Sequence, residues 1–238
     1  MRIFPPLDIF ARVVCFPVLA WQALSVARNT LVLPEAAGPR SGTMGEGPEL
    51  RLLILGDSSA AGVGVANQSE ALAGQLVAEL ARMYRVNWTL IARSGATTRD
   101  ATEMLDQSNT GHYDVVLLAL GVNDAIRLLR LEKWRSRQRR LRNKVRKIAS
   151  PRAIVVTEVP PLGLFPALPR LLRWVLGAHA ARMGVVLVDD ISQETDVHLL
   201  TIAAPIVREA MAEDGYHPSA TTYTLWTKRA AECINALR

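Results

Sequence analysis

The fold is decided by residues 50–59, which read Leu50-Arg51-Leu52-Leu53-Ile54-Leu55-Gly56-Asp57-Ser58-Ser59. A short apolar run that stops at a glycine and continues into small polar residues is typical of a buried strand that ends in a tight turn. A serine in such a turn holds its hydroxyl at the carboxyl end of the strand. Further strands that end in polar residues would bring those residues to the same edge of a sheet.

Strand-like and helix-like segments alternate along the rest of the chain. Further strands are predicted at residues 86–92, 114–120, 153–159 and 185–188. Helices are predicted at residues 69–84, 98–105 with Thr98 as cap, 131–148 and 220–237. This alternation implies parallel strands with right-handed crossovers. We therefore predict the α/β class: a three-layer α/β/α sandwich with a flavodoxin-like, doubly wound parallel sheet of about five strands.

The length of 238 residues and a hydrophobic content of 50% suit one α/β domain with a short appendage. Residues 1–33 form an apolar N-terminal segment. Residues 34–48 are rich in proline and glycine, which indicates a linker. Residues 49–238 are predicted to be the main domain.

The N-terminal segment contains an uncharged run at residues 13–27. Fifteen residues are fewer than the roughly 20 that a straight membrane-spanning helix needs. Three interpretations stay open: a helix in the membrane interface, a cleaved signal peptide with Ser25-Val26-Ala27 before the cut, and a helix packed on the domain. The run favours a membrane-associated or cell-envelope protein over a soluble cytoplasmic one.

Polar residues follow each of the first three strands. The motifs are Gly56-Asp57-Ser58, Ser94-Gly95 and Gly121-Val122-Asn123-Asp124. Each motif alone is also an ordinary turn or helix cap. In a doubly wound sheet, however, the loops at the carboxyl ends of the strands form the binding crevice. We therefore expect these residues to share one site.

A fourth motif, Asp214-Gly215-Tyr216-His217, precedes the last predicted helix. An aspartate three residues before a histidine can hold the imidazole through Nδ1, which leaves Nε2 to take a proton from a serine. The sequence predicts a catalytic triad of Ser58, Asp214 and His217. Ser59 is the weaker competitor for the role of nucleophile.

From about residue 50 to residue 237, the four motifs together resemble the SGNH, or GDSL-type, hydrolase superfamily. The resemblance implies that Ser58 attacks an ester carbonyl and forms an acyl-enzyme, with His217 as base and then acid, held by Asp214. It also implies an oxyanion hole made of the backbone N–H groups of Ser58 and Gly95 and the amide of Asn123. The chain departs from the family pattern at Ser59, where leucine is usual.

The expected function is that of a serine esterase or lipase-type acyl hydrolase of carboxylic esters, acting on a small-molecule or lipid ester. A proline-rich segment after the strand at residues 153–159 contains Leu162, Leu164 and Phe165, which are predicted to line an apolar acyl pocket. Two alternatives stay open: a carbohydrate O-acetyl esterase, and a non-catalytic binding module on the same fold.

The positive charge is concentrated in one segment. Residues 127–147 carry a net charge of +10, whereas the rest of the chain carries −4. We interpret the segment as the solvated face of a helix or as a surface for anionic membrane headgroups, and we disfavour nucleic acid as a partner.

No cofactor and no metal are expected. Gly62-Val63-Gly64 is followed by Val65, which breaks the dinucleotide-binding pattern. The Gly-x-Ser-x-Gly pattern of α/β-hydrolases fails at Ala60. Histidines, cysteines and acidic residues do not cluster at the spacing of metal ligands.

Overall fold

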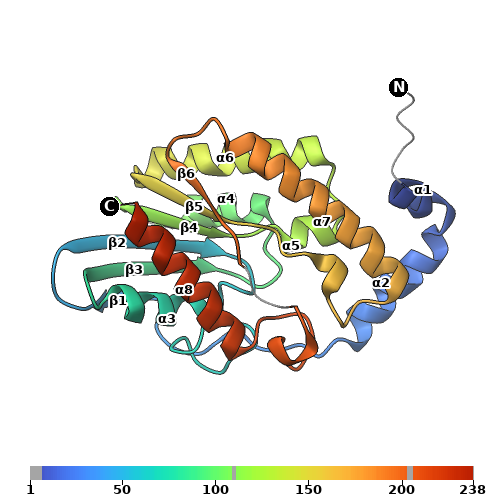
Figure 1. Cartoon of the computed structure of the whole chain (residues 1–238), viewed down its shortest axis with the longest axis horizontal. Helices are drawn as coiled ribbons and strands as arrows, with labels where there is room; N and C mark the ends of the chain where they lie inside the picture. The colour runs from blue at the N-terminus through green and yellow to red at the C-terminus, as the bar shows by residue number, and fades with distance from the viewer. Residues whose placement is uncertain (1–6, 109–110, 203–205, 238) are drawn as a thin grey trace.

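A six-stranded sheet forms the centre of the protein in the computed structural model, which describes residues 7–108, 111–202 and 206–237. The strand order is β1-β3-β2-β4-β5-β6 (Figure 1). The strands are β1 (Ser41–Met44), β2 (Glu49–Gly56), β3 (Arg85–Ala92), β4 (Val115–Ala119), β5 (Ala153–Thr157) and β6 (Val197–Leu200). All neighbouring pairs are parallel except β1 with β3. The predicted α/β class is confirmed, but the sheet has six strands rather than five and is mixed rather than wholly parallel.

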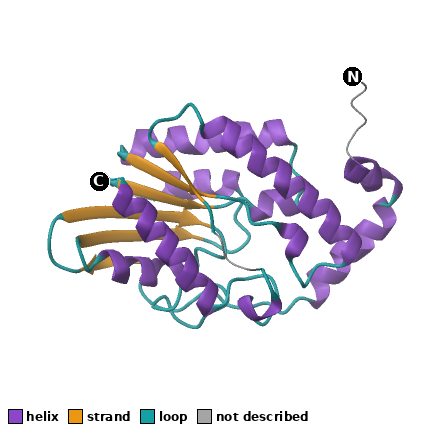
Figure 2. Ribbon diagram, viewed as in Figure 1, coloured by secondary structure: helices purple, strands orange, loops and turns teal. Residues whose placement is uncertain are grey.

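Helices lie on both faces of the sheet (Figure 2), which confirms the three layers. The α-helices are α1 (Leu7–Val14), α2 (Phe16–Asn29), α3 (Leu72–Leu80), α4 (Thr98–Gln107), α5 (Val122–Ile126), α6 (Leu131–Ala149), α7 (Arg170–Ile191) and α8 (Ala220–Ala236). Two short 3₁₀ helices are η1 (Leu162–Leu164) and η2 (Arg208–Ala210).

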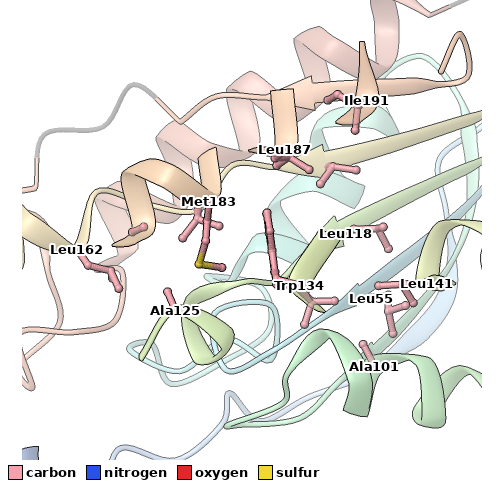
Figure 3. Close-up of a cluster of buried hydrophobic side chains, with 14 of the residues drawn as sticks. Leu55, Ala101, Leu118, Ala125, Trp134, Leu141, Leu162, Met183, Leu187 and Ile191 are labelled. Carbon is pink, nitrogen blue, oxygen red and sulfur yellow. The ribbon is translucent and has the colours of Figure 1, made fainter. Parts of the chain in front are cut away.

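Strand β2 supplies side chains to two separate cores because successive residues of a strand point to opposite faces. Leu52 and Ile54 pack under α3 and α8. Leu53 and Leu55 pack on the other face, under α4, α6 and α7 (Figure 3). Burial on both faces explains why the strand has no polar alternation.

The prediction of a strand at residues 185–188 is wrong, because these residues belong to α7. The edge position of the sheet is taken by β6 instead. Four apolar residues alone do not distinguish a strand from a helix segment. In the structure Val185 and Val188 are exposed while Leu187 is buried, which is the spacing of a helix with one buried face.

Two smaller expectations also need correction. The cap of α4 is Thr97 rather than Thr98: its side chain accepts from the Asp100 N–H, and the Asp100 carboxylate accepts from the Thr97 N–H. The segment at residues 34–48, interpreted as a linker, contains β1, whose pairing with β3 extends the sheet by one edge strand.

The basic segment forms α6, and its positive charge faces acids from neighbouring elements. Arg142 is fully buried, and its Nη2 lies 2.6 Å from both Asp190 Oδ2 and Glu194 Oε1. Arg146 Nε lies 2.7 Å from Asp196 Oδ2. The interpretation as a solvated face is therefore wrong for these residues, which join α6 to the end of α7. Further ion pairs join α6 to acids through Arg135, Arg137, Arg139 and Lys144.

Among the described residues, α7 is the one helix that is long and apolar enough to cross a membrane by itself, and α1 with α2 would reach that length as a pair bent by 85°. The buried side of α7 includes Val175, Leu176, Met183 and Leu187, all of which belong to the hydrophobic core. This packing is that of a core helix.

Candidate active site

Ser58 lies in the turn that directly follows β2. The turn is tied to the neighbouring strand because the Asp57 N–H donates to the Ala119 carbonyl over 3.1 Å. Its far side is held by α8, where the Tyr223 hydroxyl donates to the carbonyls of Ser59 and Val63. Ser58 is therefore positioned by a strand and by the last helix together.

The structure brings His217 and Asp214 to Ser58 across 159 residues of sequence. His217 Nε2 lies 2.8 Å from Ser58 Oγ, and His217 Nδ1 lies 2.5 Å from Asp214 Oδ2. The other carboxylate oxygen of Asp214 accepts from the backbone N–H groups of Tyr216 and His217. The three predicted residues thus form one hydrogen-bonded series.

The hydrogen bonds at Asp214 keep this carboxyl ionised. Burial acts to raise the pKa of Asp214, but the hydrogen bonds from the His217 ring and from two backbone N–H groups outweigh it, and the pKa lies below the ordinary value. An ionised Asp214 beside Nδ1 selects the tautomer in which Nε2 faces Ser58 without a proton.

Asp57 behaves in the opposite way. Its carboxyl is completely buried, and burial raises its pKa to about 6 against hydrogen bonds from the Ser59 hydroxyl and N–H and against the positive charge of His217. Because the Ser59 hydroxyl donates to Asp57 over 2.8 Å, it is not aimed at His217. The hydrogen bonding therefore sets Ser58 apart from Ser59.

Gly95 and Asn123 follow β3 and β4, at the same edge of the sheet as Ser58. Gly95 has φ +76°, and a Cβ added there would meet no atom within 4 Å, so the space beside its backbone is open. Asn123 Nδ2 donates to the Ala96 carbonyl over 3.0 Å and lies 3.5 Å from Asp57 Oδ2. Asn123 does not cap α5, whose N-cap is Gly121.

Asp124 cross-links the loops that hold Gly95 and Asn123. Its buried carboxylate accepts from the backbone N–H and the hydroxyl of Thr98, at 2.8 and 2.7 Å. Gln138 of α6 donates to the same hydroxyl over 3.0 Å. The two loops are therefore held in register by buried polar contacts.

Gly64 allows the loop with His217 to lie against the loop with Ser58. Its φ is +108°, and a Cβ added there would lie 2.3 Å from the carbonyl oxygen of Pro218, the residue after His217. The sequence analysis considered Gly62-Val63-Gly64 only as a failed dinucleotide motif. This close approach could not be recognised before the two loops were placed side by side.

A cavity of about 380 Å³ opens beside Ser58 and His217, and most of its wall is apolar. Phe165 lines it as predicted, but Leu162 is buried in the core and Leu164 is 58% exposed, and neither lines it. These two residues lie on the one-turn helix η1, which points them away from the cavity. The wall residues that the sequence analysis missed come from several loops and short helices: Thr30, Leu31, Val32, Leu33, Val122, Ile126, Ile202, Ile206 and Met211.

Within the described residues, no group of three or more His, Cys, Asp or Glu side chains is placed to hold a metal ion. Glu158 also lines the cavity. Burial raises its pKa, although it accepts a hydrogen bond from the Ile202 N–H.

The fold and the hydrogen-bonded series define the class: a doubly wound α/β protein with a Ser-His-Asp site at the carboxyl edge of its sheet. Residues 54–225 match the GDSL-like lipase/acylhydrolase family model, and the chain belongs to this family. The resemblance noted from the four motifs is thereby confirmed.

Several known proteins are similar to this chain. The chain is 29% identical over 189 residues to the GDSL-like esterase Rv1075c of Mycobacterium tuberculosis, and the match covers 74% of this chain but only 59% of that protein. The structure is similar to the psychrotrophic esterase EstA from Pseudoalteromonas sp., with TM-score 0.60, 20% identity, and coverage of 78% of this chain and 97% of that one. It is also similar to TesA, with TM-score 0.64, 19% identity, and coverage of 79% and 99%.

Proposed function

We propose that this protein is a serine hydrolase of carboxylic esters in which Ser58, His217 and Asp214 are the catalytic triad. The observation that carries the proposal is the unbroken series of hydrogen bonds from Ser58 Oγ through the His217 ring to Asp214. Membership of the GDSL-like lipase/acylhydrolase family supports the reaction class. An intact series also argues against a binding module that has lost its chemistry.

The proposed reaction has two acyl transfers. Ser58 Oγ attacks the ester carbonyl while its proton passes to His217 Nε2, and the imidazolium then protonates the departing alcohol. Water next gives a proton to His217 and attacks the acyl-enzyme, and His217 returns that proton to Ser58 Oγ as the carboxylic acid is released. Asp214 stabilises the imidazolium in both steps.

The developing oxyanion would be bound by the backbone N–H groups of Ser58 and Gly95 and by the side-chain amide of Asn123. Asn123 Nδ2 donates to the Ala96 carbonyl over 3.0 Å and, over a longer 3.5 Å, to Asp57 Oδ2, so the amide hydrogen that faces Asp57 would turn to the oxyanion when substrate binds. The contact between Asp124 and Thr98 supports this role because it holds the two donor loops together.

The substrate class we propose is an ester with an apolar acyl chain. The support is the apolar wall of the cavity next to Ser58, where Phe165, Ile126 and Ile206 are among the lining residues. Such a wall offers few partners for sugar hydroxyls, which disfavours the carbohydrate O-acetyl esterase.

Fluorophosphonate labelling tests the nucleophile. The wild type and Ser59→Ala are expected to react, whereas Ser58→Ala is expected to stay unlabelled and to lose hydrolysis of nitrophenyl esters. Labelling of Ser58→Ala, or its loss in Ser59→Ala alone, would assign the nucleophile to Ser59. No labelling of the wild type would favour the binding module.

A series of nitrophenyl esters from acetyl to long acyl chains tests the substrate class. We expect kcat/KM to rise with chain length until the cavity is filled. Each methylene group that enters an apolar site contributes about 0.8 kcal/mol, which is about fourfold in kcat/KM. A flat profile or activity confined to acetyl esters would contradict an acyl-binding cavity.

We also propose that the protein associates with a membrane and that α6 is not the contact. The ion pairs of α6 with Asp190, Glu194 and Asp196 already neutralise much of its charge. Fewer of its positive side chains are therefore available to bind lipid phosphate groups than its sequence suggests. The same pairing disfavours nucleic acid. A variant with Arg140→Gln and Lys147→Gln, both outside these ion pairs, is expected to bind anionic vesicles as the wild type does in a flotation assay.

A further inference from the structure

Helices α1 and α2 contact the domain through polar side chains. Asp8 is 3% exposed, and its carboxylate accepts hydrogen bonds from Arg12 and from Arg182 of α7 at 2.5 to 3.0 Å. Gln22 of α2 accepts from the backbone N–H of Leu172 over 3.0 Å, in the first turn of α7. That turn has no side-chain cap of its own, because its N-cap residue is Pro169.

Most large apolar side chains of these two helices point the other way. Leu7, Phe10 and Trp21 are 76%, 61% and 67% exposed, whereas a helix on a soluble domain usually buries its apolar face. Leu19 is buried and Val26 is partly buried. The remaining large apolar residues of this outer face are also exposed: Ile9, Val13, Val14, Phe16, Val18 and Leu24. An exposed apolar surface of this extent marks a binding surface.

This outer face continues into the mouth of the cavity beside Ser58. Ala27 at the end of α2 lines the cavity, and so do residues 30–33 that follow it. Leu31 and Val32 are 48% and 90% exposed, so they belong to the outer surface and to the cavity wall at once. In Figure 1, α1 and α2 lie at the end of the molecule toward which the strand arrows point, which is the end that carries the site.

The chemistry of the surface fits a lipid bilayer. Tryptophan and exposed arginines beside an apolar face are typical of helices that lie in the membrane interface. Arg28 lies in the last turn of α2, and Arg170 begins α7, whose first turn contacts Gln22. Both arginines are exposed, and neither forms an ion pair within the described part of the chain. A protein partner seated on Leu31 and Val32 would cover the cavity mouth, whereas a lipid phase could deliver substrate through it.

From these contacts we infer that the outer face of α1 and α2 lies on an anionic bilayer and that the cavity receives its substrate from that bilayer. The substrate class is a membrane-resident lipid ester whose acyl chain passes between Val32 and Phe165 to reach Ser58. Hydrolysis breaks the acyl C–O bond, water supplies a hydroxyl to the acyl carbon and a proton to the alcohol, and no co-reactant is needed. The inference rests on the esterase function proposed above.

Flotation with vesicles of phosphatidylcholine and phosphatidylglycerol tests the surface in the full chain. A variant with Phe10→Ser and Trp21→Ser is expected to lose vesicle affinity by roughly tenfold or more, because two apolar side chains no longer enter the lipid. The matched control carries Val185→Ser and Val188→Ser, which remove two exposed valines from α7. Equal binding of both variants, or no binding of the wild type, would overturn the inference.

Two activity measurements separate this inference from the esterase function. The Phe10→Ser and Trp21→Ser variant is expected to hydrolyse soluble nitrophenyl butyrate at the wild-type rate but a vesicle-embedded ester at least about tenfold more slowly. Ser58→Ala is expected to float with vesicles and to hydrolyse neither ester. If the wild-type protein floats with vesicles but hydrolyses neither ester, the esterase function is contradicted and the membrane surface is not. A variant equally active on both esters would contradict delivery from the bilayer.

The orientation of the mouth has its own test. Val32→Cys, in a background with Cys15→Ser and Cys233→Ser, is labelled with a polarity-sensitive fluorophore, and Val185→Cys in that background is the control. Emission from position 32 is expected to shift to shorter wavelength on vesicles, and emission from position 185 is not. A shift at position 185 alone would place the exposed valines of α7, and not the cavity mouth, on the lipid.

Discussion

The cavity beside Ser58 has two kinds of boundary, a polar row and an apolar wall, and they are built differently. The polar row consists of Ser58, Gly95 and Asn123, which follow strand ends, and of His217 and Asp214, which lie on the loop before α8 and are joined to Ser58 by hydrogen bonds. The apolar wall comes from segments outside the sheet, such as residues 30–33 and the loop with Phe165. The difference teaches that the sheet edge and the loop before α8 set the chemistry, whereas the added segments set which ester is accepted.

The largest expected effect is that of Asp214→Asn in the polar row. An amide beside His217 Nδ1 favours the wrong tautomer, so kcat should fall by about 10⁴-fold on every ester, short or long. Steady-state kinetics on acetyl and octanoyl esters measures this. A loss of activity on only one of the two esters would mean that Asp214 determines substrate selectivity. The polar row and the apolar wall would then not have separate roles.

Asn123→Ala should lower kcat by roughly 100- to 1,000-fold, because one oxyanion donor is lost. The exposed side chain Asn143, on α6, offers a control as Asn143→Ala. Thermal unfolding of both variants should stay close to that of the wild type. An Asn123→Ala protein that unfolds much earlier and keeps its kcat would show a structural rather than a catalytic role.

Gly64→Ala tests whether the row depends on the contact between two loops. The new Cβ would lie 2.3 Å from the Pro218 carbonyl in a backbone conformation that favours glycine, so the His217 loop must move. We expect kcat to fall by about 10- to 100-fold, since a displacement of about 1 Å is costly in a preorganised site. Gly184→Ala, on an open helix position, is the control and should keep full activity.

Ile126→Trp probes the apolar wall. Ile126 is 45% exposed at the cavity, so the substitution fills space with little cost in stability. We expect kcat/KM to fall by about tenfold for long acyl esters and to stay within about twofold for acetyl esters. A uniform loss across the chain-length series would place this residue with the polar row.

Asp57→Asn has the smallest expected effect on turnover. Its main effect is on the pH dependence of the free energy of unfolding. The folded-state pKa of Asp57, about 6, exceeds the ordinary 3.8, so the wild type loses stability as pH rises from about 4 to about 6. The asparagine variant lacks this loss. Its free energy of unfolding relative to wild type should therefore rise over that range and level off above it. Urea titrations at pH 4.5 and 7 measure the difference, and a constant difference would contradict the raised pKa.

The local order of the sequence was enough to place most of the row. Gly56-Asp57-Ser58, Gly95 and Asn123 each follow a run of apolar residues, and parallel strands bring such positions to one edge. The strand predicted at residues 185–188 failed because a four-residue apolar run has the same composition in a strand and in a helix. The arginines of α6 looked solvated because their partners, Asp190, Glu194 and Asp196, are about 50 residues away.

What the sequence determined alone is the class of fold and the candidates for the reactive groups, since periodicity predicts the strands, and the turn motifs with their resemblance to the GDSL-type family indicate the residues. Tertiary structure decided the rest: that Gly64 admits Pro218, that Leu162 joins the core while Phe165 meets the cavity, and that α1 turns Asp8 inward and Phe10 outward. The physical reason is that burial and close approach depend on which distant segments pack together. A local pattern gives the possible faces of a segment, and its neighbours choose which face is covered.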